Sequence, residues 1–348
     1  ATTATANLVV VGSAVTSNSQ GIDVTGVVTA TSFVGSGANL TSIPAGNLTG
    51  TVADARISTL TSSKLSGALP AISAANLTNI PAANITGTLP AISGANLTGL
   101  PAARSYRNLI INGAMTIAQR GTSSTSSGMN TIDRWTNNWS GGGVTQSQVS
   151  EQSGTAFENG FSNYLRLTNT SNTTTDTDYR FIGQTIEAQN VANSGWNFKS
   201  SSSYVTLSAW VRSSLAGTYY GWLNSRDGTG QTYTFSYTLS ANTWTKITKT
   251  IPGNSNVSVH NNTEEGLVVH FIPWYGTYYT TSGHTLNAWQ SSSSTNRTPD
   301  YSQNWANTSN ATFDVTGVQL EVGSSATTFE HRSVADELTR CQRYYFAM

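Results

Sequence analysis

Polar and apolar residues follow two different patterns along the chain. In residues 1–103, single Leu and Ile residues recur among Ala, Ser, Thr, Asn and Gly. From Arg104 onward, apolar and polar residues alternate at every second position in short runs. Such alternation is typical of β-strands that bury one face. The pattern therefore predicts a repetitive first region, 1–103, and a β-rich second region that begins at Arg104.

The second region contains at least eight alternating runs, separated by turns rich in Gly, Asn and Ser. These runs are 164–168, 180–187, 204–212, 219–224, 232–239, 243–251, 267–272 and 311–322. Many short strands with hardly any helical periodicity between them are typical of β-sandwiches. We therefore predict an all-β fold in which 104–332 form one antiparallel β-sandwich head of the jelly-roll type.

A single helix is expected at the C-terminal end, over residues 333–348. Ser333 is a good N-cap with Asp336 three residues later. Val334, Leu338, Cys341 and Tyr345 form an apolar stripe at helical spacing. We expect this stripe to pack on the head or on a neighbouring chain, with Cys341 as a buried thiol.

The first region repeats two short motifs. The first, Asn-Leu-Thr-x-Ile/Leu-Pro, begins at Asn39, Asn76 and Asn96, and the second begins at Asn47, Lys64 and Asn84. The second and third copies of each motif lie 20 residues apart, and recurrence at that length marks a repeat architecture. The same repetition explains the recurring Asn-x-Thr, so we do not expect glycans there.

Each repeat offers few apolar residues to a core. Burial is worth ~25 cal/mol per Å², which does not offset an ordering cost of ~1–2 kcal/mol per residue in a single chain. Three chains around one axis can bury the central residues of the motifs. These residues are Leu40, Leu48, Leu77, Ile85 and Leu97. We therefore predict a trimeric extended β stem over 1–103, with a disordered linker as the alternative.

The N-terminal stretch has its own features. Residues 22–35 alternate well enough to predict strands that glycines interrupt. The first residue is Ala1 rather than Met, and no basic segment of a signal peptide follows it. We accordingly expect an N-terminal anchor to precede Ala1.

Composition excludes some partners. The chain has 17 basic and 17 acidic residues, so it lacks the excess of positive charge that binding to the phosphates of a nucleic acid requires. No apolar run reaches the ~18 residues that a membrane-spanning helix needs. With one cysteine, an intrachain disulfide cannot form. We predict neither a nucleic-acid partner nor membrane insertion.

Both ends of the second region resemble a known family. The opening motifs are RNLIINGAM at 107–115, AQRG at 118–121 and DRW at 133–135, and the closing motifs are VQLEVG at 318–323, FEHR at 329–332 and CQRYY at 341–345. These motifs resemble the head domain of tail fibres from marine phages, including cyanophages, and 1–103 resembles their shafts. The middle resembles carbohydrate-binding-module jelly rolls only in its pattern. The resemblance implies a virion location, a homotrimer and recognition of the host surface, but no ligand-binding residues.

The pattern of acids and histidines gives little support to catalysis. Glycosidases commonly need two carboxylates about 5–9.5 Å apart. Glu264 and Glu265 are adjacent in a polar turn, where neighbouring side chains point apart, and the four histidines are scattered without metal-ligand spacing. We therefore predict no enzyme, no cofactor and no metal site. A structural calcium at Asp176 and Asp178 is left open.

A cluster of aromatic residues is the predicted ligand site. Sugar rings stack on Trp and Tyr, while their hydroxyls pair with amides. The candidates are Trp274, Tyr275, Tyr278, Tyr279 and Trp289, with Asn287 and Gln290 as hydroxyl partners. Their stretch reads as a turn or long hairpin, and we expect residues 274–289 to form an exposed loop region of the head. Core or trimer packing is the alternative for this cluster. It is the preferred interpretation for the other tryptophans, Trp135, Trp210, Trp222 and Trp244.

Together these features predict a non-enzymatic virion tail-fibre protein that adheres to a host polysaccharide or lipopolysaccharide. It would attach to other tail proteins through the expected anchor. The alternatives are a purely structural virion or adhesin part and, less favoured, a polysaccharide depolymerase.

Overall fold

A computed structural model describes residues 15–18, 21–29, 31, 32, 34, 41 and 107–347. The chain divides into two units, Ala1–Ile92 and Ser93–Met348, and each is considered by itself. In the first unit, β1 (Val15–Asn18) and β2 (Gly21–Val24) form an antiparallel hairpin. The predicted stem repeats, with the leucines and isoleucine expected on the axis, lie outside the described residues.

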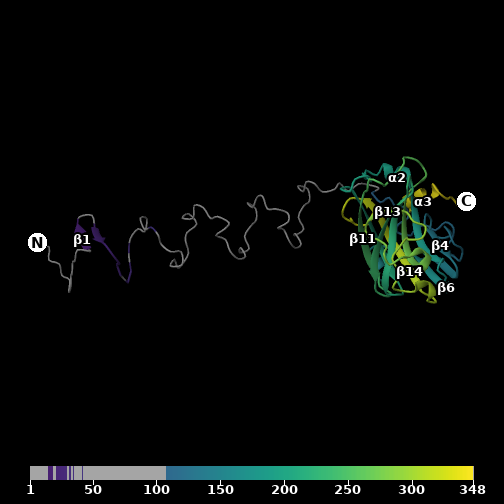
Figure 1. The fold of residues 1–348 in the computed structure, drawn as a ribbon, viewed down its shortest axis with the longest axis horizontal. Helices are drawn as coiled ribbons and strands as arrows, with labels where there is room; N and C mark the ends of the chain where they lie inside the picture. The colour runs from purple at the N-terminus through teal and green to yellow at the C-terminus, as the bar shows by residue number, and fades with distance from the viewer. Residues whose placement is uncertain are drawn as a thin grey trace. The chain divides into compact units, whose positions relative to one another are not determined.

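The second unit is a sandwich of two six-stranded antiparallel sheets (Figure 1). Sheet I has the order β13 (Trp289–Ser291), β10 (Gln231–Leu239), β9 (Gly217–Ser225), β12 (Glu265–Tyr275), β7 (Tyr179–Glu187) and β4 (Thr136–Ser140). Sheet II has the order β11 (Thr245–Pro252), β8 (Tyr204–Ser213), β14 (Thr312–Val322), β6 (Asn163–Ser171), β5 (Gly143–Ser150) and β3 (Ser123–Ser124). This architecture confirms the predicted antiparallel β-sandwich.

The core lies between the sheets and follows from strand alternation. On β8, Val205, Leu207 and Val211 have no exposed surface, and on β12 the same holds for Leu267 and Phe271. Because successive side chains of a strand point to opposite faces, each alternating run supplies one row of core residues. The residues between these rows point away from the core, and on sheet I they form the site described below.

The two ends of the second unit are joined by a buried polar network. The amide of Asn108 donates to the Val318 carbonyl at 3.1 Å, and its Oδ1 accepts from Leu320 N at 3.0 Å. Glu330 accepts from Asn108 N at 2.8 Å, and Arg332 donates to the Asn108 carbonyl at 2.7 Å. The opening and closing sequence motifs therefore form one structural unit that ties the start of the head to β14.

Helix α3 (Val334–Gln342) is the expected C-terminal helix, and Ser333 accepts a hydrogen bond from Asp336 N at 3.2 Å as its cap. The apolar stripe is corrected at two positions, because Val334 is 64% exposed and the helix ends at Gln342, before Tyr345 and short of the predicted end at residue 348. Cys341 is buried as predicted and packs with Ile111 and Ile117. Burial raises the pKa of this thiol to about 12, so it stays protonated and inert at neutral pH.

Two further helices were not expected from the sequence. They are the one-turn helices α1 (Thr155–Glu158) and α2 (Ala188–Ala192). Both are too short to give a hydrophobic period, which is why the pattern did not reveal them. Across the part of the chain that the structure describes, every helix is too short or too polar to cross a bilayer.

Candidate functional site

The outer face of sheet I carries a row of aromatic rings. Phe181 of β7 stacks on His270 of β12 with ring centroids 4.3 Å apart, and Trp222 of β9 stacks on the other side at 5.0 Å. The three strands are adjacent in the sheet, in the order β9, β12 and β7. Alternation places these rings opposite the core residues Leu223 and Phe271 of the same strands. The row is thus built from segments far apart in the sequence.

Gly183 makes room for this row. A Cβ built on Gly183 would lie 2.3 Å from Cδ2 of His270, closer than any real contact of that kind. The imidazole therefore lies over the backbone of β7, at a position that any larger residue would occupy. This packing fixes His270 between its two aromatic neighbours.

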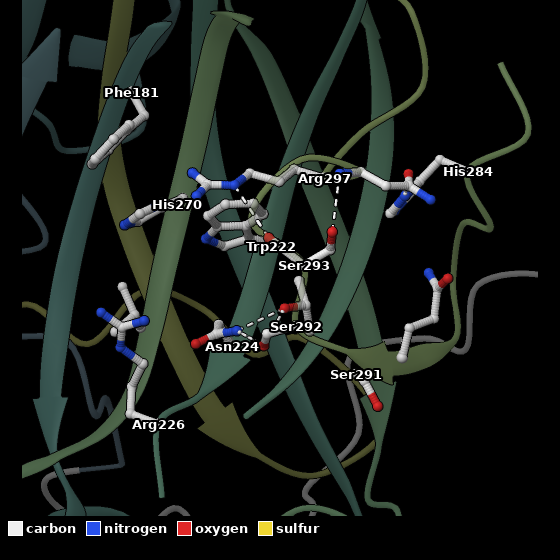
Figure 2. Close-up of a pocket in the computed structure, with 14 residues that line it drawn as sticks. Phe181, Trp222, Asn224, Arg226, His270, His284, Ser291, Ser292, Ser293 and Arg297 are labelled. Carbon is white, nitrogen blue, oxygen red and sulfur yellow. Dashed lines mark hydrogen bonds between the residues drawn. The ribbon is translucent and has the colours of Figure 1, made fainter. Parts of the chain in front are cut away.

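A pocket of about 280 Å³ opens next to the row (Figure 2). Its floor is the outer face of sheet I, and its far wall is β13 with the segment that follows it. The lining residues are Phe181, Trp222, Asn224, Arg226, Thr232, Val268, His270, His284, Gln290, Ser291, Ser292, Ser293, Asn296 and Arg297. Aromatic surface and hydrogen-bonding groups thus line one cavity, as in sites that bind small polar molecules.

Asn224 is held in a fixed orientation at the floor of the pocket. Its Nδ2 donates to Thr232 Oγ1 at 2.6 Å and to Ser292 Oγ at 2.7 Å, and these two oxygens lie 2.9 Å apart. Figure 2 shows the amide pointing toward Ser292. The amide oxygen is therefore the group left over for a ligand.

Several buried polar atoms of this pocket have no hydrogen-bond partner among the described residues. They are Trp222 Nε1, Asn224 Oδ1, His270 Nδ1 and His284 Nε2. Trp222 and Asn224 are only 9% and 7% exposed. Leaving a buried polar group unpaired costs about 1–3 kcal/mol, so such a concentration of them is expected where a ligand supplies the partners. These unpaired atoms are the strongest structural sign of a binding site in the described part of the chain.

The electrostatics of the pocket are positive. Arg226 and Arg297 both line it, and none of its lining residues is an acid. Burial lowers the pKa of His270 to about 3, helped by the positive charges of Arg226 and Arg297. His270 is therefore neutral at physiological pH, and the positive charge of the pocket comes from Arg297, because Arg226 is paired with Glu265 at 2.8 Å.

A second hollow adjoins the pocket and shares Asn224, Arg226 and Ser292 with it. Three acids line it: Asp227, Glu264 and Glu265. Each is engaged with a neighbour. Arg226 pairs with Glu265 at 2.8 Å, His260 with Asp227 at 3.0 Å, and Asn262 donates to Glu264 at 2.9 Å. The turn predicted for the two glutamates is corrected at Glu265, which begins β12.

The structure places the predicted aromatic cluster differently from the sequence. Trp274 and Tyr275 lie in β12 and are only 9% and 2% exposed, so the prediction of an exposed loop is wrong for both. The strand continues through Pro273 because a register shift lets β12 keep pairing with β7 up to Tyr275. Trp274 packs into the main hydrophobic core, and the Tyr275 ring lies 5.3 Å from that of Tyr279.

The other predicted residues have mixed positions. Tyr278 and Tyr279 lie in a 3-10 turn (Thr277–Tyr279), and Tyr278 is 49% exposed. Trp289 begins β13, and its Nε1 donates to the carbonyl of Pro252 at 2.6 Å. This hydrogen bond fixes its ring at the end of β11. Gln290 lines the pocket, whereas Asn287 does not. A sugar-binding role for these residues stays a prediction.

Sequence reasoning missed the central residue of the pocket. The sequence pattern favours core or trimer contacts for Trp222, but its ring lies on the outer face of sheet I, at the pocket. Trp135 and Trp244 are buried as expected, and Trp210 is partly buried beside Trp244. A signal was available, because strict alternation puts Trp222 and Asn224 on the face opposite Tyr219 and Leu223.

Of the two possible calcium ligands, Asp178 has a structural role. Asp176 is exposed, whereas Asp178 is 7% exposed and accepts hydrogen bonds from Ser140, at 2.8 Å, and from Thr173. Among the described residues, no three His, Cys, Asp or Glu side chains come together as metal ligands would. Asp178 thereby fixes the turn before β7.

Comparisons with known proteins give similar solved structures but no matching sequence family. No protein-family model matches the chain, and no curated protein matches its sequence. Similar solved structures include the enzymatically active domain of tailspike protein 4 of bacteriophage CBA120, with 12% identity and a TM-score of 0.35, over 63% of this chain and 22% of that one. A family 11 carbohydrate-binding module of Clostridium thermocellum, in complex with a mixed-linked tetrasaccharide, has 14% identity and a TM-score of 0.28, over 60% and 98% of the two chains. The N-terminal cellulose-binding domain of a Cellulomonas fimi glucanase has 9% identity and a TM-score of 0.30, over 60% and 97%.

Proposed function

We propose that the head binds a glycan, without cleaving it, in the pocket on the outer face of sheet I. The observation that carries the proposal is the group of unpaired buried atoms beside an aromatic wall, with Trp222 Nε1 and Asn224 Oδ1 the most deeply buried. Sugars present hydroxyls that donate and accept, together with C–H faces that contact aromatic rings. A sugar unit therefore matches both kinds of surface in one cavity.

Binding without cleavage is favoured by the state of the nearby acids. A glycosidase needs one carboxylate free to give a proton and another free to attack or to activate water. The pocket has no acidic lining residue, and the three acids of the adjoining hollow are each engaged by a neighbour. In this proposal the adjoining hollow binds the next sugar unit of the same glycan and does not cleave it.

Two substitutions test the binding site on a glycan array. Trp222→Phe keeps an aromatic ring but removes Nε1, and Asn224→Ala removes the amide. Each is expected to weaken binding by about tenfold, the loss of one buried hydrogen bond or more. Trp139→Phe is the matched control, because it removes the same N–H from β4, outside the pocket.

The expected outcome is weaker binding with the melting temperature kept within a few degrees of the wild-type protein. If binding is lost instead in Tyr278→Ala, with both pocket variants normal, the aromatic cluster predicted from the sequence is the site. An array on which the wild-type head binds no glycan overturns the proposal.

We further propose that the chain is part of a homotrimeric virion tail fibre. The stem repeats are the main support, because one chain has too few apolar residues to bury them. In the described part of the first unit, Val27 and Val34 are 89% and 99% exposed on a single chain. Exposed apolar residues of that kind are covered when copies of the chain associate.

Native mass spectrometry of the full chain tests the assembly, and three copies of the 36.8 kDa chain are the expected species. Replacing Leu77 and Leu97 by Asp is expected to loosen the stem, because the charges would lie at its axis. The head would keep its own unfolding transition. A stable monomer, or a double variant that melts like the wild-type protein, contradicts the trimeric stem.

A further inference from the structure

Arg297 is the feature of the pocket that neutral sugar binding leaves unexplained. Its guanidinium lies 4.8 Å from the ring centroid of Tyr279 and 5.9 Å from that of Trp222. Its Nε donates to the Ser293 carbonyl at 3.3 Å. Among the described residues, no carboxylate lies within ion-pair distance of it. The ring faces attract the guanidinium, and the absence of a paired carboxylate among the described residues leaves its charge available to an anionic ligand.

Trp222 places a second donor at the same wall. Its Nε1–H can only donate, and it has no acceptor among the described residues. Figure 2 shows Arg297 extending above the Trp222 ring, on the side of the pocket away from Arg226. An indole N–H and a guanidinium next to each other suit a carboxylate, which only accepts hydrogen bonds.

The adjoining hollow has the opposite charge. Its lining holds Asp227, Glu264 and Glu265 against the single cation Arg226. Like charges brought together in a binding site cost several kcal/mol. A second acidic sugar beside the first would therefore be repelled there, whereas a neutral or amino-bearing unit would not.

From these contacts we propose that the pocket selects a hexuronate unit, with its carboxylate at Arg297 and Trp222, and that a non-acidic sugar occupies the adjoining hollow. Asn224 Oδ1 accepts a hydroxyl of the uronate. The inference rests on the proposed glycan binding and specifies its substrate class. The favoured glycan carries acids on spaced units rather than on every unit.

Three hexasaccharides with their carboxyl-reduced counterparts test this inference by isothermal titration calorimetry. Hyaluronan and glucuronoxylan oligosaccharides carry spaced acids, whereas oligogalacturonate carries one on each unit. At least one of the spaced-acid probes is expected to bind about tenfold more tightly than its reduced form, the gain of one charge-assisted hydrogen bond. Oligogalacturonate is expected to bind more weakly than that probe.

Arg297 variants assign the preference to the pocket. Arg297→Gln is expected to remove the difference in affinity between the acidic probe and its reduced form. Arg297→Lys is expected to keep part of that difference, because Lys supplies the charge without the bidentate geometry of the guanidinium. Lys246→Gln is the matched control. It makes the same change in net charge from an exposed position on β11 of sheet II.

The outcomes separate the two proposals. The reduced probes or neutral array glycans could bind as tightly as the acidic probes and still depend on Trp222 and Asn224. That result overturns the acidic selectivity and leaves the proposed glycan binding intact. The selectivity is also overturned if Arg297→Gln keeps the full preference, or if oligogalacturonate binds best. Failure of all six probes overturns the selectivity, and an array without any bound glycan overturns glycan binding as well.

Discussion

Asn112→Ala is expected to destabilise the head by about 4 kcal/mol, which is a large part of a typical domain's stability. The side chain has no exposed surface and makes four hydrogen bonds to the backbone. Its amide donates to the carbonyls of Ile117 and Asp133 at 2.8 and 2.9 Å, and its Oδ1 accepts from the N–H groups of Thr116 and Ile117 at 2.9 and 3.0 Å. Alanine would leave the Asp133 carbonyl and the Ile117 N–H buried without these partners, whereas the Ile117 carbonyl would keep its hydrogen bond from Asp133 N at 2.9 Å.

Asn112 also has a φ of 59°, in the left-handed region that costs an alanine about 1–2 kcal/mol. Asn112→Gly separates the two effects, since glycine tolerates this conformation but lacks the amide. Asn310→Ala is the matched control, because Asn310 has the same φ of 59° on the surface. Denaturant unfolding followed by tryptophan fluorescence measures the free energies. A loss for Asn112→Ala no larger than that for Asn310→Ala would contradict the role of the buried network.

The second large effect is expected at Asp314 near the start of β14. Its carboxylate has no exposed surface and accepts from Arg166 at 2.8 and 2.9 Å and from Arg212 at 2.8 Å. Asp314→Ala would leave the partly buried Arg166 without its anion and Arg212 with Glu151 alone, at 3.2 Å. Removing one partner of a buried ion pair typically costs about 3–5 kcal/mol, and we expect a loss in that range.

Asp336→Ala serves as the comparison for this loss. Asp336 pairs with Arg340 across one turn of α3 at 3.4 Å, in a position that solvent reaches. Pairs of that kind contribute about 0–1 kcal/mol. Chemical denaturation at low and at high salt distinguishes the two, because salt screens the surface pair more than the buried one. If the two variants lose the same free energy of unfolding, the buried ion pairs of Asp314 stabilise the head no more than the surface pair does, which contradicts the prediction.

The strands of the head could be predicted because their alternation is local. In the run that begins at Tyr204, the core residues Val205, Leu207, Ala209 and Val211 occupy every second position, so the sequence alone reveals both strand and face. The short strands β3 and β13 were missed, since two or three residues carry no period. The strands β4 and β5 were missed as well, because few of their residues are apolar. The buried state of Cys341 followed from its place in a helical stripe.

The site was harder to predict because it depends on the order of the strands. Phe181, Trp222 and His270 meet only because β7 and β9 flank β12, and no local pattern encodes that pairing. The predicted cluster relied on closeness in the sequence, which misled at Trp274 and Tyr275, where β12 simply continues. Of the residues predicted from the sequence to bind the ligand, Gln290 is the one that lines the pocket.

The joining of the two ends of the head has a mechanical consequence. Leu109 N donates to the Leu320 carbonyl at 2.9 Å, and Asn108 holds the same strand through its side chain. A pull on the chain before Arg107 therefore acts first on contacts to β14, which pairs with both β6 and β8 inside sheet II. Several hydrogen bonds would bear such a force at the same time. The force would be distributed over the inner strands of sheet II before an edge strand could separate.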